Sequence, residues 1–277
     1  MIQILKSMEP SIRPARPGDE QVIFGFIQEL AAYENLAHTV TGTPAQLHQH
    51  LFTPPVMAQA WIVEWEGEPV GYGLGFPFVS GLKHGLYLED LYISPAFRRQ
   101  GLGQTLLAFL ANLTRQRGGN AMRWTVLADN TPAIQFYQQL GAMIYPQARI
   151  GRLTEAALIE LTKNNSDHPD PTGVIRTYTS YSTFLTQPGL FVADRVDFGT
   201  LGASNSDLVE IELRGLARLC SQRNYGRLEW WVNLGEVDPW LGAGLGGEVL
   251  ADWRFCDLND SALTSLAARS PDHGSIR

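Results

Sequence analysis

A glycine-containing turn carries the residue pattern that is most informative about ligand binding. It runs from Arg98 to Gly103, reads R-R-Q-G-L-G, and lies between an apolar stretch and an amphipathic one. Glycines let the backbone turn tightly, and a following helix adds unpaired amides and the positive end of its dipole. Such a turn predicts an anion site that suits a pyrophosphate. The alternative is that Gly101 and Gly103 only permit a strand-to-helix turn.

A second motif follows this turn. Residues 126–142 read V-L-A-D-N-T-P-A-I-Q-F-Y-Q-Q-L-G-A, with an Asn before a helical pattern and a Tyr within it. Together the motifs resemble the R-x-x-G-x-G loop and the N-x-x-A-x-x-F-Y-x-x-x-G-F/A signature of GNAT N-acetyltransferases. Within that superfamily, Y-L-E-D-L-Y-I at 87–93 and E-L-A-A-Y-E at 29–34 look like the spermidine/spermine and thialysine acetyltransferase branch. The resemblance covers residues 11 to about 162.

The resemblance implies that acetyl-CoA is the co-substrate and that the reaction needs no metal. It also implies where acetyl-CoA would bind. Its pyrophosphate would be held at the turn, by Arg98, Arg99, Gln100, Gly101, Leu102, Gly103 and Gln104. Its pantetheine arm would pair with the main chain of Leu91, Tyr92 and Ile93. Asn130 would contact the cofactor, although an Asn directly before a helix can also serve as a plain N-cap.

The same resemblance implies two catalytic residues. Transfer of acetyl to an amine requires that the attacking ammonium lose a proton and that the departing thiolate gain one. The family places a carboxylate where this chain has Glu89 and a proton-donating tyrosine where it has Tyr137. The alternatives are a salt-bridged strand residue and a core aromatic. Strand alternation would turn the adjacent Asp90 to the opposite face.

The resemblance also suggests an acceptor site. Tyr33 and Glu34 match a Tyr-Glu pair of the branch, and the acid could bind a distal ammonium; the alternative is an exposed helix end. Related polyamine enzymes carry acids before their last strand, where this chain has Arg149. We therefore expect a small amine or an amino-acid side chain rather than a long polycation.

These residues need strands and helices to position them, and the hydrophobic pattern supplies both. We expect strands at 11–16, 60–66, 69–79, 85–94 and 122–128, helices at 22–31, 43–51, 104–116 and 131–140, and a closing segment at 148–161. This mixture predicts an α+β domain with a mixed, largely antiparallel sheet, the GNAT fold.

Charge and composition narrow the function further. The net charge is −7, of which residues 1–163 contribute −1 (12 Lys+Arg, 13 Asp+Glu) and residues 164–277 contribute −6 (9 against 15). This acidity argues against a nucleic-acid partner, because neutralising phosphates needs a basic face. No apolar run reaches the length of a membrane span. We expect a cytoplasmic protein whose two cysteines are reduced.

The second half of the chain looks like a degraded, partial copy of the first. Residues 85–90, 112–126 and 149–161 align with 189–194, 218–232 and 254–266 at offsets of 104, 106 and 105. Ala193 replaces Glu89, and no basic residue occurs at 199–204, where the turn would be. The alternative is a coincidence between similar strand-helix-strand layouts.

We therefore predict three segments: a catalytic acetyltransferase domain at 1–163, a linker at 164–173, and a non-catalytic half-GNAT lobe at 174–277 that packs within the chain as a pseudo-dimer partner. Trp230, Trp231, Leu234 and Trp240 are its expected buried contacts. The predicted function is transfer of acetyl from acetyl-CoA to a primary amine of a small molecule or side chain. The alternatives are a non-catalytic acyl-CoA-binding or regulatory module and an enzyme that uses another acyl-CoA.

Overall fold

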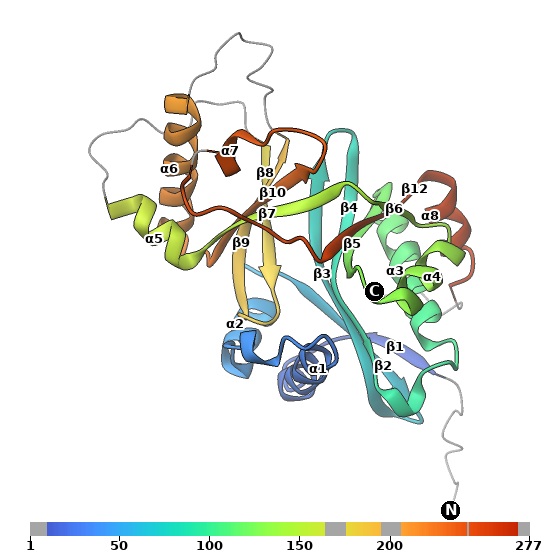
Figure 1. The fold of residues 1–277 in the computed structure, drawn as a ribbon. Helices are drawn as coiled ribbons and strands as arrows, with labels where there is room; N and C mark the ends of the chain where they lie inside the picture. The colour runs from blue at the N-terminus through green and yellow to red at the C-terminus, as the bar shows by residue number, and fades with distance from the viewer. Residues whose placement is uncertain (1–9, 164–175, 195–205, 243, 271–277) are drawn as a thin grey trace, which may run out of the picture.

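The structure is a computed structural model that describes residues 10–163, 176–194, 206–242 and 244–270 (Figure 1). The expected linker at 164–173 and the segment 199–204 lie outside these residues. Among the helices of the described ranges, none is long and apolar enough to cross a membrane.

The first half of the chain alternates strands and helices largely as predicted. Its elements are β1 (Ser11–Pro14), α1 (Glu20–Tyr33), α2 (Pro44–Phe52), β2 (Gln59–Trp65), β3 (Glu68–Ser80), β4 (Lys83–Ile93), α3 (Leu102–Gln116), β5 (Ala121–Leu127), α4 (Thr131–Gln139) and β6 (Met143–Tyr145). Local signals set several bounds. The Thr43 hydroxyl accepts a bond from Gln46 N at the start of α2, and Gly141 follows α4 with a φ of +90°.

The second half contains β7 (Ala148–Thr154), α5 (Glu155–Lys163), β8 (Arg176–Ser182), β9 (Gln187–Asp194), α6 (Ser206–Gln222), β10 (Arg227–Asn233), α7 (Pro239–Gly242), β11 (Glu248–Val249), β12 (Trp253–Asn259) and α8 (Asp260–Ala267). From β8 to α8, helices and strands follow one another in the same order as from β3 to α5.

The strands form two sheets that exchange one strand each. The first has the order β1-β2-β3-β4-β5-β12-β6 and the second β11-β7-β10-β9-β8. The expectation that residues 148–161 close the first sheet is therefore wrong: β7 lies in the second sheet, α5 follows it, and β12 fills the place between β5 and β6. Figure 1 shows β7 and β12 passing one another in opposite directions. We call the first sheet with α1–α4 and α8 the first lobe, and the second sheet with α5–α7 the second lobe.

Equivalent strands of the two sheets pair in equivalent registers. The parallel pair Leu86↔Met122 of β4 and β5 corresponds to Leu190↔Leu228 of β9 and β10, which are 104 and 106 residues further along. The pairings of β5 with β12 and of β10 with β7 also correspond, with Leu127 opposite Trp253 and Asn233 opposite Ala148. Even the register shift recurs, between positions 74 and 75 in β3 and between 176 and 177 in β8.

The exchanged strands begin with matching contacts. The Arg149 guanidinium donates to the carbonyls of Pro146 and Ala148, and that of Arg254 donates to those of Ala251 and Trp253. Each arginine thus bonds the carbonyls three and one residues before itself.

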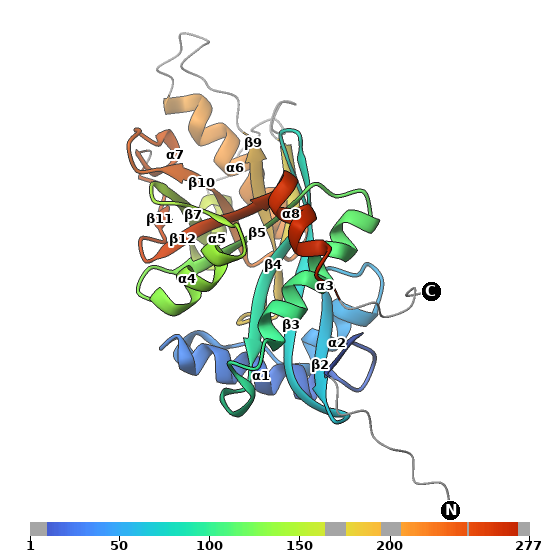
Figure 2. The ribbon, with the colours of Figure 1, turned by 90° about the vertical axis from the view of Figure 1, so that its right-hand side faces the viewer.

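Three hydrophobic clusters hold the layers together. One lies between the first sheet and α3, α4 and α8, and a second lies under α1 and α2 on the opposite face. The third joins α5, α6 and α7 to the outer face of the second sheet (Figure 2). Trp230 and Trp240 are buried in this third cluster, whereas Trp231 packs between Phe191 and Phe255 at the junction of the lobes. Leu234 is half exposed, so its expected burial is wrong.

Candidate active site

The main cavity opens where two parallel strands separate. β4 and β5 pair only from Gly85↔Ala121 to Tyr87↔Arg123. Beyond that point residues 88–93 of β4 and 124–127 of β5 line a cavity of about 950 Å³. Because the two strands no longer pair with each other there, the gap between them suits an extended molecule.

The predicted anion-binding turn lies at one end of this cavity. Arg99 and Gly101 have φ values of +61° and +81°, and the first backbone bond of α3 runs from Thr105 N to Gly101 O. The amides of residues 102–104 therefore precede the first intrahelical bond, as helix-start amides do. All the residues predicted for this turn line the cavity except Gln100, which donates to Ala96 O.

Arg98 has partners within the protein. Its Nε donates to Ile93 O at 2.8 Å, and its guanidinium lies over the rings of Tyr33 and Tyr92, at 4.8 and 5.4 Å from their centroids. These contacts fix the turn against β4 and α1. The predicted acceptor residue Tyr33 thus stands at the cavity mouth as the support for Arg98.

Two further predicted residues lie on the opposite wall. Asn130 caps α4, because its Oδ1 accepts from Ala133 N at 3.3 Å, and it also lines the cavity. Tyr137 is buried in the same wall, edge-on to Trp124 with centroids 4.9 Å apart. Burial raises the pKa of the Tyr137 hydroxyl, and nearby Cys256, Glu34 and Tyr33 raise it further. Tyr137 is therefore neutral and able to donate a proton.

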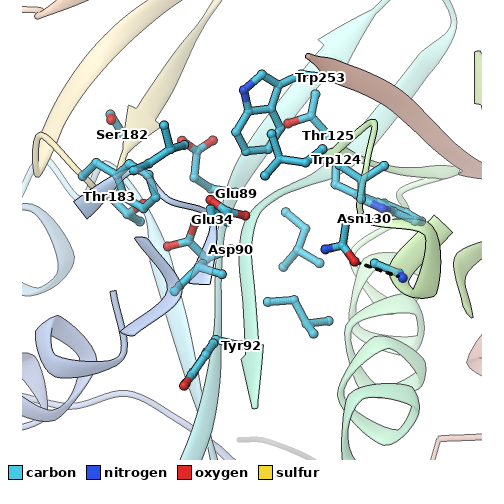
Figure 3. Close-up of a pocket in the computed structure, with 18 of the residues that line it drawn as sticks. Glu34, Glu89, Asp90, Tyr92, Trp124, Thr125, Asn130, Ser182, Thr183 and Trp253 are labelled. Atoms are coloured by element: carbon cyan, nitrogen blue, oxygen red, sulfur yellow. Dashed lines mark hydrogen bonds between the residues drawn. The ribbon is translucent and has the colours of Figure 1, made fainter. Parts of the chain in front are cut away.

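Three carboxylates meet at one end of the cavity. Figure 3 shows Glu34, Glu89 and Asp90 grouped, with Thr183 on one side and Asn130 on the other. The expectation that strand alternation turns Asp90 away from Glu89 is wrong, because both residues line the cavity. The register of β4 shifts at this point, since Leu74 faces Asp90 and Gly75 faces Leu88, which leaves Glu89 as the extra residue of a β-bulge.

Burial raises the pKa of all three carboxyl groups. The pKa of Glu34 is raised to about 8, by burial first and then by Asp90 and Glu89. That of Glu89 is raised to about 7, with burial opposed by Arg227. The pKa of Asp90 is raised to about 6 by burial, and hydrogen bonds from Tyr72 and Thr183 oppose this rise. A buried acidic group of this kind favours a cationic ligand.

The second lobe forms the remaining wall, so the cavity is not confined to residues 11–163. Its lining residues from this lobe include Arg152, Ser182, Thr183, Phe191, Arg227 and Glu229. The Arg227 guanidinium reaches Glu89 Oε1 at 3.1 Å. None of these residues was predicted for the site. For Arg227 and Glu229 the available signal is the pattern R-L-E-W-W-V at 227–232, where two charges alternate along an otherwise apolar strand.

Arg149 does not line the cavity, which removes the argument that it repels polycations there. Its guanidinium is held by the carbonyls of Pro146, Ala148 and Ala251. Arg152, three residues further along β7, does line the cavity, but both of its hydrogen bonds go to Glu229.

The sequence of the first lobe matches a known family of enzymes. Residues 27–142 match the model of the acetyltransferase (GNAT) family. The chain belongs to the GNAT family of acetyltransferases, because it also covers 86% of a curated relative at 34% identity.

That relative is the thialysine N-epsilon-acetyltransferase of Bos taurus, aligned with 50% of this chain. L-ornithine N5-acetyltransferase NATA1 of Arabidopsis thaliana is 27% identical over 56% of this chain and 88% of its own length. Spermidine/spermine N(1)-acetyltransferase-like protein 1 of Homo sapiens is 30% identical over 48% of this chain and 20% of its own length. The chain is therefore an N-acetyltransferase by family, and GNAT acetyltransferases take acetyl from acetyl-CoA.

Proposed function

We propose that this enzyme transfers acetyl from acetyl-CoA to a primary amine of a small cationic molecule by direct attack. The observation that carries the proposal is the single cavity that joins the anion-binding turn to the cluster of Glu34, Glu89 and Asp90. An anionic donor and a cationic acceptor would enter the two ends, so that the thioester and the amine meet between β4 and Tyr137.

The donor end fits acetyl-CoA. Amides at residues 99–104 and the start of α3 would hold the pyrophosphate, and Gly101 leaves open space there, with no atom within 4 Å of where a Cβ would stand. The main chain of Leu91, Tyr92 and Ile93 borders the gap between the strands and would pair with the pantetheine arm. The Asn130 amide would contact the same arm, since its cap bond uses only Oδ1.

Glu89 is the proposed base. Its pKa of about 7 lets it take a proton, directly or through water, from the ammonium near neutral pH. The free amine then attacks the thioester carbonyl, and the carbon–sulfur bond breaks. Tyr137 is the proposed acid, whose neutral hydroxyl gives a proton to the leaving thiolate.

The acceptor is proposed to carry a second positive group. With Glu89 assigned to the reacting amine, Glu34 and Asp90 remain to bind another ammonium. The relatives' names include thialysine and L-ornithine, both amino acids with a side-chain amine. We therefore propose a basic amino acid or a short diamine as the acceptor.

We further propose that the chain contains a diverged internal repeat, in which the second lobe serves the first as a built-in partner. The matched registers, the recurring bulge and the equivalent bonds of Arg149 and Arg254 support this origin. On this view the two repeat units are the catalytic domain at 1–163 and the C-terminal unit at 174–277, and each contributes its last described strand to the sheet of the other.

The test is a panel of amines assayed with acetyl-CoA by release of CoA. The panel pairs acceptors that carry a second ammonium, such as ornithine, lysine and a short diamine, with monoamines of matched length. Turnover should be highest with the dicationic acceptors. If no amine gave turnover while acetyl-CoA still bound, the chain would be an acyl-CoA-binding module instead.

A further inference from the structure

An arginine from the second lobe contacts the proposed base of the first. Arg227 begins β10, and its Nη2 donates to Glu89 Oε1 at 3.1 Å and to Tyr181 O at 2.8 Å. Its Nε lies 3.0 Å from Glu229 Oε2. The side chain is 8% exposed and that of Glu89 16%, so the pair is shielded from water.

The position of Arg227 is fixed by groups other than Glu89. Glu229, two residues along β10, is itself bonded by both Nε and Nη2 of Arg152 at 2.9 and 2.7 Å. The carbonyl of Tyr181 on β8 holds the other side of the guanidinium. The arginine is thus preorganised by the second lobe and presents one N–H to Glu89.

Glu89 needs such a partner because its other charged neighbours are acidic. Asp90 on the same strand, Glu34 at the end of α1 and Glu229 on β10 face it. The titratable hydroxyls near it are those of Tyr72, Tyr87, Tyr178 and Tyr181. Within the described residues, Arg227 is the cation bonded to Glu89. Without it, burial and three acids would favour the protonated carboxyl, which cannot act as a base.

We propose that Arg227 is a positioning residue for acetyl transfer: the second lobe, through this guanidinium, orients Glu89 and keeps it ionised near neutral pH. The inference rests on the proposed role of Glu89 as the base. It gives the second lobe a part in the reaction, although that lobe has Ala193 at the position equivalent to Glu89.

The sign of the effect follows from the charges. Arg227 lowers the pKa of Glu89, so removing the arginine raises that pKa above about 7. The base form then appears only at higher pH. In Arg227→Met, the rise of kcat/KM with pH should move to higher pH by about one unit, which corresponds to a loss of about tenfold below pH 7 and recovery in alkali. Arg227→Lys should restore most of the wild-type profile.

The matched control is Arg123→Met. Arg123 is buried to a similar degree, with 9% of its side chain exposed, and it pairs with Asp257. If Arg123 is removed, Asp257 still has Lys83 as a cationic partner, just as Glu229 still has Arg152 when Arg227 is removed. Arg123 does not line the cavity. This variant should lose stability as Arg227→Met does and keep the wild-type pH profile.

The double variant Glu89→Gln/Arg227→Met separates the proposal from a general packing effect. If Arg227 acts through Glu89, the double variant should be no slower than Glu89→Gln alone, because coupled residues do not add. Additive losses, or an Arg227→Met profile superimposable on wild type, would overturn the proposal. An inactive wild-type protein would overturn the proposed function as well, whereas an active wild type with an unshifted variant would overturn this inference alone.

Discussion

At the scale of single residues, the grouping of one buried and two half-buried acids controls how the cavity titrates. Glu34, Glu89 and Asp90 share one end of it, and burial raises the pKa of each. A bound ammonium would reverse part of this rise, since an opposite charge favours the ionised form. Acceptor binding should therefore release protons around neutral pH.

The first prediction concerns Glu89. Its pKa is raised from 4.5 to about 7, so the ionised base is scarce below pH 6 and predominant above pH 8. We expect kcat/KM to rise with pH through this range, and Glu89→Gln to lower the rate and flatten the rise. Rates measured from pH 5.5 to 9 with one acceptor would check this. A Glu89→Gln enzyme with the wild-type rate and profile would contradict the assignment.

Tyr137→Phe should lower turnover far more than it weakens acetyl-CoA binding. The ring and its edge-on contact with Trp124 remain, and only the proton donor is lost. General acid catalysis contributes about 10²–10⁴-fold, which sets the size of the expected loss. Steady-state rates and calorimetric titration with acetyl-CoA separate the two effects. Equal losses in binding and turnover would instead indicate a packing role.

Glu34→Gln should raise KM selectively for acceptors with a second ammonium. The amide keeps the shape of the side chain but removes the charge that the proposed distal group would meet. A monoamine acceptor serves as the internal control, and its KM should change little. The idea fails if the two kinds of acceptor lose affinity equally.

At the scale of elements, the turn before α3 is the part on which donor binding depends. Its Gly101 has a φ of +81° and open space around the Cβ position. Gly118, at the other end of the same helix, has the same φ and the same open space, but it lies outside the cavity. The two glycines thus share a backbone conformation, and only Gly101 faces the cavity.

Gly101→Leu should therefore abolish acetyl-CoA binding, whereas Gly118→Leu should not. Both substitutions strain a left-handed backbone and should cost similar stability. Only the first places a side chain where the pyrophosphate would approach the amides. Titration with acetyl-CoA, beside a thermal melt of each variant, would test this. Binding retained by Gly101→Leu would move the donor site elsewhere.

The elements themselves were largely readable from the sequence, because their signals are local. Thr43 and Pro44 mark the start of α2, and Gly141 the stop after α4. The sheet to which a strand belongs is not a local property. β7 and β12 carry similar patterns, so either could lie beside β5, and only the packed chain decides.

The same difference between local and long-range determinants explains which site residues were predicted from the sequence. Glu34, Glu89 and Tyr137 were predicted because they lie in recognisable motifs. Asp90 was misplaced because a bulge breaks strand alternation, and a bulge leaves no mark in the residue types here. Arg227 was missed because it is separated from Glu89 by 138 residues and reaches it only through the junction of the lobes.

At the scale of the whole molecule, the exchanged strands make the lobes interdependent. Residues 1–163 alone would lack β12, leaving β5 and β6 without the strand between them, and β7 without β10 and β11. Unpaired strand edges promote association. We expect this fragment to aggregate or to dimerise by exchanging β7, and co-expression of residues 164–277 to restore a soluble active complex. Sizing with light scattering, together with the amine assay, would check this. A fully active monomer of unchanged melting temperature would contradict it.

The exchange also constrains the order in which the chain can fold during synthesis. Domains usually fold as they leave the ribosome, N-terminal unit first. Here the first lobe must wait for Trp253–Asn259, the last strand within the described residues, before its sheet can close. At 5–20 residues per second, the hundred or so residues between β6 and β12 take roughly 5–20 seconds to translate. Throughout that time the edge of β5 that β12 will cover is unpaired. The nascent chain therefore gains a complete first sheet only after β12 has been synthesised.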